Sequence, residues 1–568
     1  MDKTTAPYRF VDYSTKIFYP PWGEQQGNDI RFDMPYRESQ SGEITIELTA
    51  KSPIFVGDFK DDNNVREFFQ HNGSYYIPGS SIKGMIRRIA AILSFSKMSL
   101  EDRTLSYRDL NNPSYKKKAK VQNKIFMGWL YQKSKKWYIQ DVGKFNKNNN
   151  EINCNDLKNH FGAIWDSMQD KSASDKYKMA KQRLAFHNGT IVFTGAAGKK
   201  NIEFVFPNPL NKNIITEIEL TQKQIQNFKE AYYIGTPNES KDWKKQWSER
   251  FEKGEKIPVF FQKDSQNKII HFGLSKLYKL PYENSIGTLY KNSLENFDEN
   301  KLDFVERIFG FVKDDNALKG RISFSHFKAL GNPEKCKTES LILSTPRPTF
   351  YPYYLKQTPK TLFKTYDNED AKLSGFKFYV PRHELLRTRN NNNNNITTKI
   401  TALKEGTKFI GKIRYFNLRK EELGLLLLSL TFLKQEHFYK IGGAKPYGYG
   451  DCHLKLSTPL DINTFIESYV NFTKHEFKQN PCESISAKQL LEVSKKSNGD
   501  TLRYLELKEF SNIKSKNQSE YGKKDGKKDG KKYNNGTQKK QRNQNMSKNY
   551  TDAKSFDSPF SMLKELKK

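Results

Sequence analysis

The first residues of this 568-residue chain that could do chemistry follow a Pro-Gly turn at residues 78–79. Either serine of the Ser-Ser pair that comes next is a good N-cap for a helix, and Lys83 and Arg87 lie four residues apart on one face of that helix. A helix N-terminus with free amides, hydroxyls and a neighbouring cation suits a phosphate group. The candidate phosphate contacts in this motif are Ser80, Ser81, Lys83, Gly84 and Arg87. An ordinary amphipathic helix with solvated charges has the same pattern.

A second motif comprises residues 307–312 and 318–325, joined by a short loop. Apolar residues at 322 and 324 alternate with Arg321 and with serines at 323 and 325, which predicts a strand with one core-facing side and one polar, cationic side. Lys319 and Arg321 are therefore candidate contacts to a nucleic-acid backbone. A sheet face that is simply open to water is the alternative.

The third motif, residues 441–450, contains four glycines, one lysine and two tyrosines. Glycines let a backbone approach a ligand closely, and the tyrosines could stack on bases. The candidate contacts here are Gly442, Gly443, Lys445 and Tyr447. The spacing matches neither a P-loop nor a dinucleotide fingerprint, so we do not expect a nucleotide cofactor.

The segments around these motifs read as strands punctuated by helices. Alternating apolar residues predict strands over 44–50, 191–194, 202–206, 259–262 and 409–415. Helical periodicity predicts helices over 82–93, 222–233, 421–433 and 462–478. This mixture is typical of an α+β fold.

Composition favours an acidic partner. The chain has 97 Lys and Arg against 64 Asp and Glu, a formal charge of +33, and such a field concentrates polyanions. A genome rich in Lys and Asn codons would give the same bias. The longest apolar stretch, near residues 423–433, is too short for a membrane span, and residues 1–23 lack a signal-type apolar region, so we expect a cytoplasmic protein. The four cysteines have no metal-type spacing, so we expect neither zinc nor a disulfide framework.

The end of the chain differs from the rest. Residues 511–550 hold 12 Lys and Arg, 3 Asp and Glu and almost no aliphatic side chains, which predicts a disordered basic tail over 513–568.

Several motifs together resemble a known family. IPGSSIKGMIR, the IFGFV and KGRISFS pair, and GGAKPYGYG occur in the order typical of the RAMP superfamily of CRISPR-associated proteins. Segments 41–57, 271–287 and 343–355 resemble one long-chain family of type III RAMP proteins, and the likeness extends over about residues 6–507. The resemblance implies a ferredoxin-like, RRM-related core that binds CRISPR RNA in a type III antiviral effector complex. The partners it implies are CRISPR RNA, target RNA and other type III subunits, without a membrane.

Each of the three motifs occurs once, which favours one RAMP core interrupted by a long insertion. We therefore expect an N-terminal extension over 1–40, the first part of the core over 41–105 and its second part over 301–460, with a helical segment over 461–512 before the tail. Residues 106–300 are the insertion, or a degenerate second ferredoxin-like unit.

The resemblance also implies a candidate catalytic residue. Backbone RAMP subunits of type III complexes can cut target RNA with an acidic residue between the first strand and the Pro-Gly-Ser-Ser helix, and Asp62 is at the matching position. Asp58 and Asp61 are close competitors, and residues 66–69 depart from the family pattern. A carboxylate there could bind Mg²⁺ and activate a ribose hydroxyl, whereas RNA binding alone requires no cofactor. A solvated acidic turn is the alternative.

We thus expect an RNA-binding subunit that holds the guide RNA or its duplex with target. The alternatives are a metal-dependent endoribonuclease that cuts target RNA through the Asp62 loop, and less favoured, a CRISPR RNA maturation nuclease with a histidine base. A general single-strand RNA binder is a further possibility. The histidines available as a base are His71, His187, His271, His326, His383 and His437.

Overall fold

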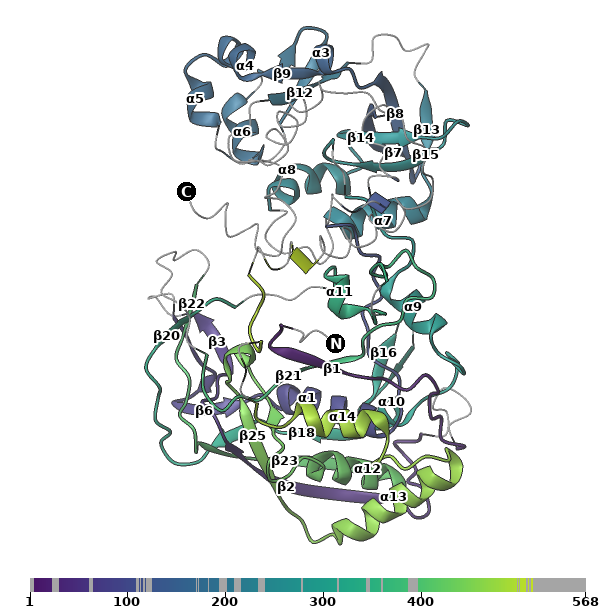
Figure 1. The fold of residues 1–568 in the computed structure, drawn as a ribbon, viewed down its shortest axis with the longest axis vertical. Coiled ribbons are helices and arrows are strands. Elements are labelled where there is room, and N and C mark those ends of the chain that lie inside the picture. The colour runs from purple at the N-terminus through teal and green to yellow at the C-terminus, as the bar shows by residue number, and fades with distance from the viewer. Residues whose placement is uncertain are drawn as a thin grey trace, which may run out of the picture.

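The computed structural model describes most of residues 5–513. Within that range it leaves out 23–29, 61–64, 109–111, 113, 116–117, 119–124, 170, 172, 182, 194–201, 209–215, 233–240, 277–278, 314–315, 344–347, 359–360, 387–396, 498, 500, 507–508 and 510–511. The described elements form two lobes, and the lobe that carries the first and last parts of the chain lies below in Figure 1. None of the described helices is long and apolar enough to cross a membrane.

The lower lobe is built on an eight-stranded antiparallel sheet. The longest strands are β2 (Gln40–Ala50) and β23 (Lys408–Leu418), which pair along nearly their whole length. The strand order is β24–β25–β2–β23–β19–β6–β5, and β18 also pairs with β23. The other strands are β24 (Tyr439–Lys440), β25 (Asp451–Ser457), β19 (Phe327–Ala329), β18 (Ile322–Phe324), β6 (Ser74–Ile77) and β5 (Gln70–His71).

Helices cover one face of this sheet. The central helix α1 (Gly79–Leu93) buries Ile82, Ile86 and Ile89 in the same apolar core as the inward residues of β2 and β23. Along β23 buried and exposed residues alternate strictly up to Phe416, because one side of the strand faces the helices and the other is open. The helices that share this core with α1 are α10 (Phe304–Phe309), α12 (Lys420–Thr431), α13 (Ile462–Glu476) and α14 (Ile485–Val493).

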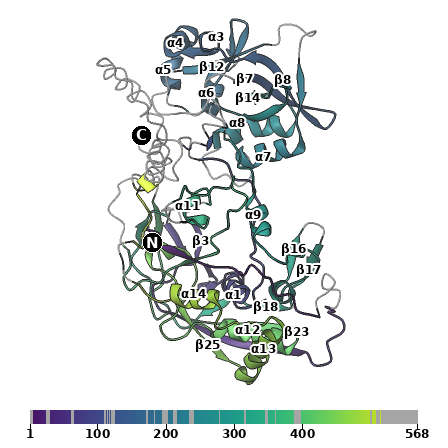
Figure 2. The same cartoon turned by 45° about the vertical axis from the view of Figure 1, so that its right-hand side comes forward.

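The upper lobe has two sheets with cores of their own. One has the order β13–β8–β7–β14–β15 and the other β10–β11–β12–β9. Figures 1 and 2 show both sheets well away from the sheet of the lower lobe. The strands are β7 (Phe126–Lys133), β8 (Lys136–Lys144), β9 (Glu151–Asn153), β10 (Ala185–Phe186), β11 (Gly189–Val192), β12 (Ile202–Pro207), β13 (Glu217–Glu219), β14 (Ile257–Lys263) and β15 (Ile269–Gly273). The helices are α3 (Lys147–Asn150), α4 (Cys154–Phe161), α5 (Ile164–Met168), α6 (Ala173–Ala180), α7 (Gln222–Tyr232) and α8 (Lys241–Glu252).

Smaller elements complete the lower lobe and the part of the chain that connects it to the upper lobe. Strand β1 (Tyr8–Val11) pairs with β21 (Phe376–Tyr379), and β16 (Phe311–Lys313) forms a hairpin with β17 (Asn316–Leu318) at the side of the lobe in Figure 2. A four-stranded sheet has the order β20–β22–β4–β3. Its strands are β20 (Glu339–Leu341), β22 (Thr398–Ile400), β4 (Val65–Phe68) and β3 (Gly57–Lys60), and the remaining helices are α9 (Ile286–Asn292) and α11 (Tyr351–Tyr354).

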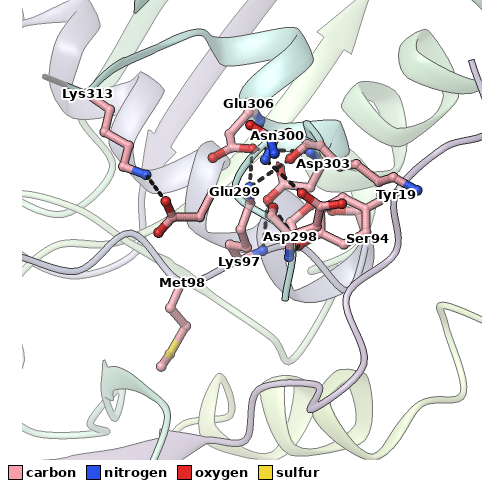
Figure 3. A network of polar contacts seen from close by, with 12 residues as sticks. Tyr19, Ser94, Lys97, Met98, Asp298, Glu299, Asn300, Asp303, Glu306 and Lys313 are labelled. Atoms are coloured by element: carbon pink, nitrogen blue, oxygen red, sulfur yellow. Dashed lines mark hydrogen bonds and ion pairs between the residues drawn. The ribbon is translucent and has the colours of Figure 1, made fainter. Parts of the chain in front are cut away.

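A polar network fixes α10 at the end of α1 (Figure 3). Asp303 caps α10 in a capping box with Glu306, and its carboxylate also accepts a hydrogen bond of 2.9 Å from the backbone amide of Lys97. The Lys97 ammonium lies 2.7 Å from Glu306. Burial, and then the nearby Asp303 carboxylate, raise the pKa of Glu306 to about 7. The network thus ties the chain after α1 to the helix that precedes the second motif.

The α+β class predicted from the pattern is confirmed, and each predicted strand and helix has a counterpart. Strands 44–50 and 409–415 are parts of β2 and β23, while helices 82–93 and 421–433 correspond to α1 and α12. The prediction of a disordered tail lies almost entirely outside the described residues.

Candidate nucleic-acid interface

The fold places the first motif directly against the second. The Gly79 amide, at the start of α1, donates a hydrogen bond of 3.1 Å to Nδ1 of His326. A Cβ on Gly79 would lie only 2.3 Å from the carbonyl oxygen of Phe324, so this position admits glycine alone. The close approach brings the first turn of α1 onto β18.

The predicted N-cap is wrong. Helix α1 starts at Gly79, and Pro78 is the N-cap and offers no capping side chain; the Gly79 amide bonds to His326 and the Ser81 amide to the Pro78 carbonyl oxygen. Because the helix begins one residue before Ser80, neither serine occupies the capping position. Ser80 is exposed and Ser81 is half-buried. The first turn therefore offers the Ser80 amide and two serine hydroxyls, which are groups that can bind an anion.

Three cations follow on α1. Lys83 and Arg87 are half-buried and Arg88 is exposed, while Gly84 between them is open, with nothing near the place of a Cβ. The Lys83 ammonium lies 3.5 Å from the place that a Cβ on Gly320 would occupy. Partial burial, and then the charge of Arg87, lower the pKa of Lys83. The helix thus presents a positive side next to the loop of the second motif.

The second motif turns tightly at two glycines. A Cβ on Gly310 would lie 2.5 Å from the Gly320 nitrogen, and one on Gly320 would lie 2.6 Å from the Phe309 carbonyl oxygen. This contact closes the base of the β16–β17 hairpin and leaves Lys319 exposed beside it. The Lys319 ammonium lies 5.5 Å from the centre of the Phe32 ring.

The prediction that Arg321 lies on an open cationic face is wrong. Its side chain is 2% exposed and pairs with the buried carboxylate of Glu422, and its Nη1 donates to the Asn417 carbonyl oxygen at 2.6 Å. Strand β18 begins only at Ile322, so the alternation that places Ser323 outward does not extend back to Arg321. A guanidinium in this position supports the fold and cannot reach a phosphate.

Glu422 lies between two arginines. Arg307 Nε is 3.5 Å from the Glu422 carboxylate that pairs with Arg321, and all three side chains are fully buried. Burial opposes ionisation of Glu422, yet its pKa is lowered because Arg321 and Arg307 stabilise the carboxylate. The pairing holds Arg321, which the sequence predicted to contact a ligand, in the core instead.

The glycines of the third motif serve packing. A Cβ on Gly442 would lie 2.2 Å from the Phe55 carbonyl oxygen, and the Gly443 amide donates to the same oxygen at 2.7 Å. Gly442 has a positive φ of 83°, which also favours glycine. These contacts fix the loop on the segment that follows β2.

The prediction that Tyr447, in the same loop, stacks on a base is also wrong. Tyr447 is 6% exposed, and its hydroxyl donates to the Ile342 carbonyl oxygen at 2.6 Å. A single helical turn over Lys445–Tyr447, preceded by Ala444 at a φ of 51°, directs the ring into a small apolar core with Phe55. Its neighbour Tyr449 is 4% exposed in the same core. Neither ring is available to a base.

Lys445 from the same turn meets two cations that sequence reasoning missed. Removal from water, and then the charges of Arg88 on α1, of Lys440, and of Lys377 on β21, lower the pKa of Lys445 to about 8. Removal from water, and then Arg88, lower the pKa of Lys377 to about 8 as well. Arg88 Nη1 donates to the Lys377 carbonyl oxygen at 3.1 Å. The one signal in the sequence that could have pointed to Arg88 was its position beside the candidate cations Lys83 and Arg87.

These residues form one surface, which we call the α1 cation band. It runs from the loop of the second motif across α1 to the third motif, and its members are Lys83, Arg87, Arg88, Lys319, Lys377 and Lys445. Within the described part of the chain, none of the six forms an ion pair with a carboxylate. Four of them, Lys83, Arg87, Lys377 and Lys445, are partly removed from water, and cations in that situation with no carboxylate partner among the described residues favour an anionic ligand.

The predicted catalytic position cannot be placed on this surface. Asp62 and its competitor Asp61 lie outside the described residues, and Asp58 belongs to β3. Among the described residues no group of three or more His, Cys, Asp or Glu side chains could hold a metal ion. Of the histidines, His326 lies at the start of α1, where Gly79 fixes its Nδ1 as an acceptor, and burial lowers the pKa of His271, in the other lobe, to about 4.

Comparison with known proteins identifies the class. The family model of the RAMP superfamily matches residues 47–268 and 276–453, which is most of the chain, and the protein therefore belongs to the RAMP superfamily. No curated protein matches the chain.

Solved structures give weak likenesses. A chain of the Type III-B Cmr-beta complex bound to cognate target RNA matches at 9% identity and a TM-score of 0.18, covering 75% of this chain and 98% of that one. Csc2 of Thermofilum pendens matches at 12% identity and a TM-score of 0.13, covering 73% of this chain and 94% of that one.

Proposed function

We propose that this protein is a CRISPR RNA-binding subunit of a type III antiviral effector complex and holds the guide RNA or its duplex with target. The observation that carries the proposal is the α1 cation band, because six cations that pair with no carboxylate among the described residues line one surface of a RAMP superfamily protein. Such a surface suits the repeated phosphates of a nucleic-acid backbone. Binding of this kind requires no cofactor.

The strand order supports a ferredoxin-like, RRM-related core beneath this surface. In chain order β2, β19, β23 and β25 stand side by side as β25–β2–β23–β19, with α1 between the first two and α12 between the last two. A four-stranded antiparallel sheet crossed by two helices in this sequence is the split βαβ arrangement. The upper lobe is inserted between α1 and β19.

Each member of the band has a definite part in this proposal. The Ser80 amide and the serine hydroxyls at the start of α1 bind one phosphate, and Lys83 and Lys319 neutralise its charge from the side. Lys445, Lys377 and Arg88 receive another further along the strand. The buried Arg307–Glu422–Arg321 group holds the second motif in place for these contacts.

The experiment is purification of the full chain with its complex, followed by a salt titration. We expect bound RNA, and an affinity that falls linearly with salt on logarithmic axes, since each neutralised phosphate of single-stranded RNA releases about 0.7 counterion. An affinity that is the same at low and moderate salt contradicts the proposal. Cleavage of complementary target RNA, tested with magnesium and with EDTA and in Asp62→Ala, decides separately whether the subunit is also an endonuclease.

A further inference from the structure

Two exposed phenylalanines lie at the end of the α1 cation band. Phe32, from the N-terminal extension, is 39% exposed, and Phe416, near the end of β23, is 40% exposed. Their rings are stacked, with centroids 6.3 Å apart and planes within 10°. Met34, 61% exposed, follows two residues later in the same segment. Exposed parallel rings of this size leave apolar surface in water that a flat ligand can cover.

The pair is held in place by a buried amide. Asn417 follows Phe416, its Oδ1 accepts from the Tyr36 amide at 2.8 Å, and its Nδ2 donates to the Arg31 carbonyl oxygen at 3.0 Å. Asn417 is fully buried and has a φ of 52° within β23, opposite the irregularity in the pairing of β2 between Gln40 and Gly42. These two hydrogen bonds fix the segment that carries Phe32 against the end of β23, so the ring pair is a preformed feature.

Positive charge lies directly beside the rings. The Lys319 ammonium is 5.5 Å from the centre of the Phe32 ring, and the next residue, Gly320, is the one approached by Lys83. Phe416 is joined to this loop by the backbone, because its amide donates to the Arg321 carbonyl oxygen at 2.9 Å. A flat apolar surface next to cations that lack a carboxylate partner matches the two parts of a nucleotide, the base and its phosphate.

We propose that Phe32 and Phe416 stack on an unpaired base of single-stranded RNA whose phosphate is bound by Lys319. This inference rests on the proposed function and extends it. The RNA would continue from α1, past β18, to the open face of the sheet. The ring faces carry no hydrogen-bonding groups, so the site accepts any base. A protein partner at this site would need acidic side chains opposite the same cations, and release of a co-purifying subunit by Phe416→Ala would indicate one.

The experiment measures binding of a fluorescein-labelled single-stranded oligouridylate to the full chain. Phe416→Ala should weaken binding roughly 5- to 100-fold, the range measured for loss of one base–aromatic stack. The dependence on salt should stay the same because no charge is removed, whereas Lys319→Ala should lower the salt slope by about one. Phe416→Trp should restore affinity, and its fluorescence should be quenched by the bound base.

The matched control is Ile410→Ala, on the same strand and the same open face, with 39% exposure. We expect its affinity to stay within about twofold of the unmodified chain, since a lone aliphatic side chain offers no ring. An oligonucleotide with abasic sites should bind the unmodified chain and Phe416→Ala alike. A Phe416→Ala penalty that persists on the abasic RNA overturns the stacking site.

The two proposals fail in different ways. If Lys83→Ala weakens RNA binding and Phe416→Ala does not, the stacking site is wrong and the RNA-binding function stands. If neither change weakens binding, both proposals fail. If Phe416→Ala leaves RNA affinity unchanged and releases a co-purifying subunit, the rings belong to a protein interface and the stacking site is overturned.

Discussion

The cations on the helix side and on the open side of the central sheet differ in whether they are paired with carboxylates. On the open side Lys408 lies 3.1 Å from Glu47, and both Lys412 and Arg414 pair with Glu43. In the α1 cation band none of the six cations has such a partner among the described residues. Net charge alone therefore does not distinguish the two sides of the sheet, whereas the presence or absence of carboxylate partners among the described residues does.

The buried arginines add a third case to this comparison. Arg321 and Arg307 belong to the same motif as Lys319, but Glu422 neutralises them in the core. Arg321, which stabilises the fold, is only two positions after Lys319, which is exposed. The predictions below test whether the pairing state of a cation decides its role, beginning with the largest expected effect.

Removal of the buried carboxylate should have the largest effect. Glu422→Gln leaves Arg307 and Arg321 buried without a counter-charge, so the free energy of unfolding should fall by about 3–5 kcal/mol. Urea denaturation measures the loss. The matched control is Glu43→Gln on the open face, where exposed pairs should change stability by less than about 1 kcal/mol. Equal losses in the two variants would remove the distinction between buried and surface pairs.

Removal of unpaired cations should weaken RNA binding next. Lys83→Ala and Lys445→Ala alter two separate parts of the band, and each should cost roughly 1 kcal/mol of binding and lower the salt slope by about one. The double variant should lose about twice as much, because separate phosphates are involved. Thermal unfolding should change little for Lys83→Ala, since the Ile82–Ile86–Ile89 face is untouched. Fluorescence anisotropy over a salt series measures both quantities, and an unchanged slope in the double variant contradicts the band.

The pH dependence of binding should be a smaller effect with a defined sign. The pKa values of Lys445 and Lys377 are each lowered to about 8, so both side chains are charged below that pH and lose their protons as the pH rises through it. RNA affinity should therefore fall between about pH 7 and pH 9, a range in which phosphodiesters do not titrate. Lys445→Arg with Lys377→Arg should bind RNA equally well across this range, because the guanidinium stays charged. A fall of the same size in the arginine variant would assign the titration to other groups.

The smallest effect should come from the paired cations of the open face. Lys412→Ala removes a lysine whose charge Glu43 already offsets, so RNA affinity should change by less than about 0.5 kcal/mol and the salt slope by much less than one. The same anisotropy series provides the measurement. A loss as large as that of Lys83→Ala would show that the RNA recruits paired cations as well.

Local sequence pattern was sufficient for the elements of the core. The alternation at 44–50 and the spacing of Ile82, Ile86 and Ile89 depend on which side of a strand or helix meets the core, a property of neighbouring residues alone. The ordered motifs were also enough to indicate the family that the match to residues 47–268 and 276–453 establishes. Lys83, Arg87, Lys319 and Lys445 were candidate contacts from the sequence and all four lie in the band.

Only the tertiary structure decided which charged and aromatic side chains are open to a ligand. Arg321 is buried because Glu422, far along the chain, arrives on α12, and Tyr447 is buried because the loop rests on Phe55. Lys377 joins Lys445 only because β21 packs beside α1, and Phe32 meets Phe416 only because Asn417 holds the N-terminal segment. Burial and pairing are set by contacts between distant segments, and periodicity within one segment contains no information about them.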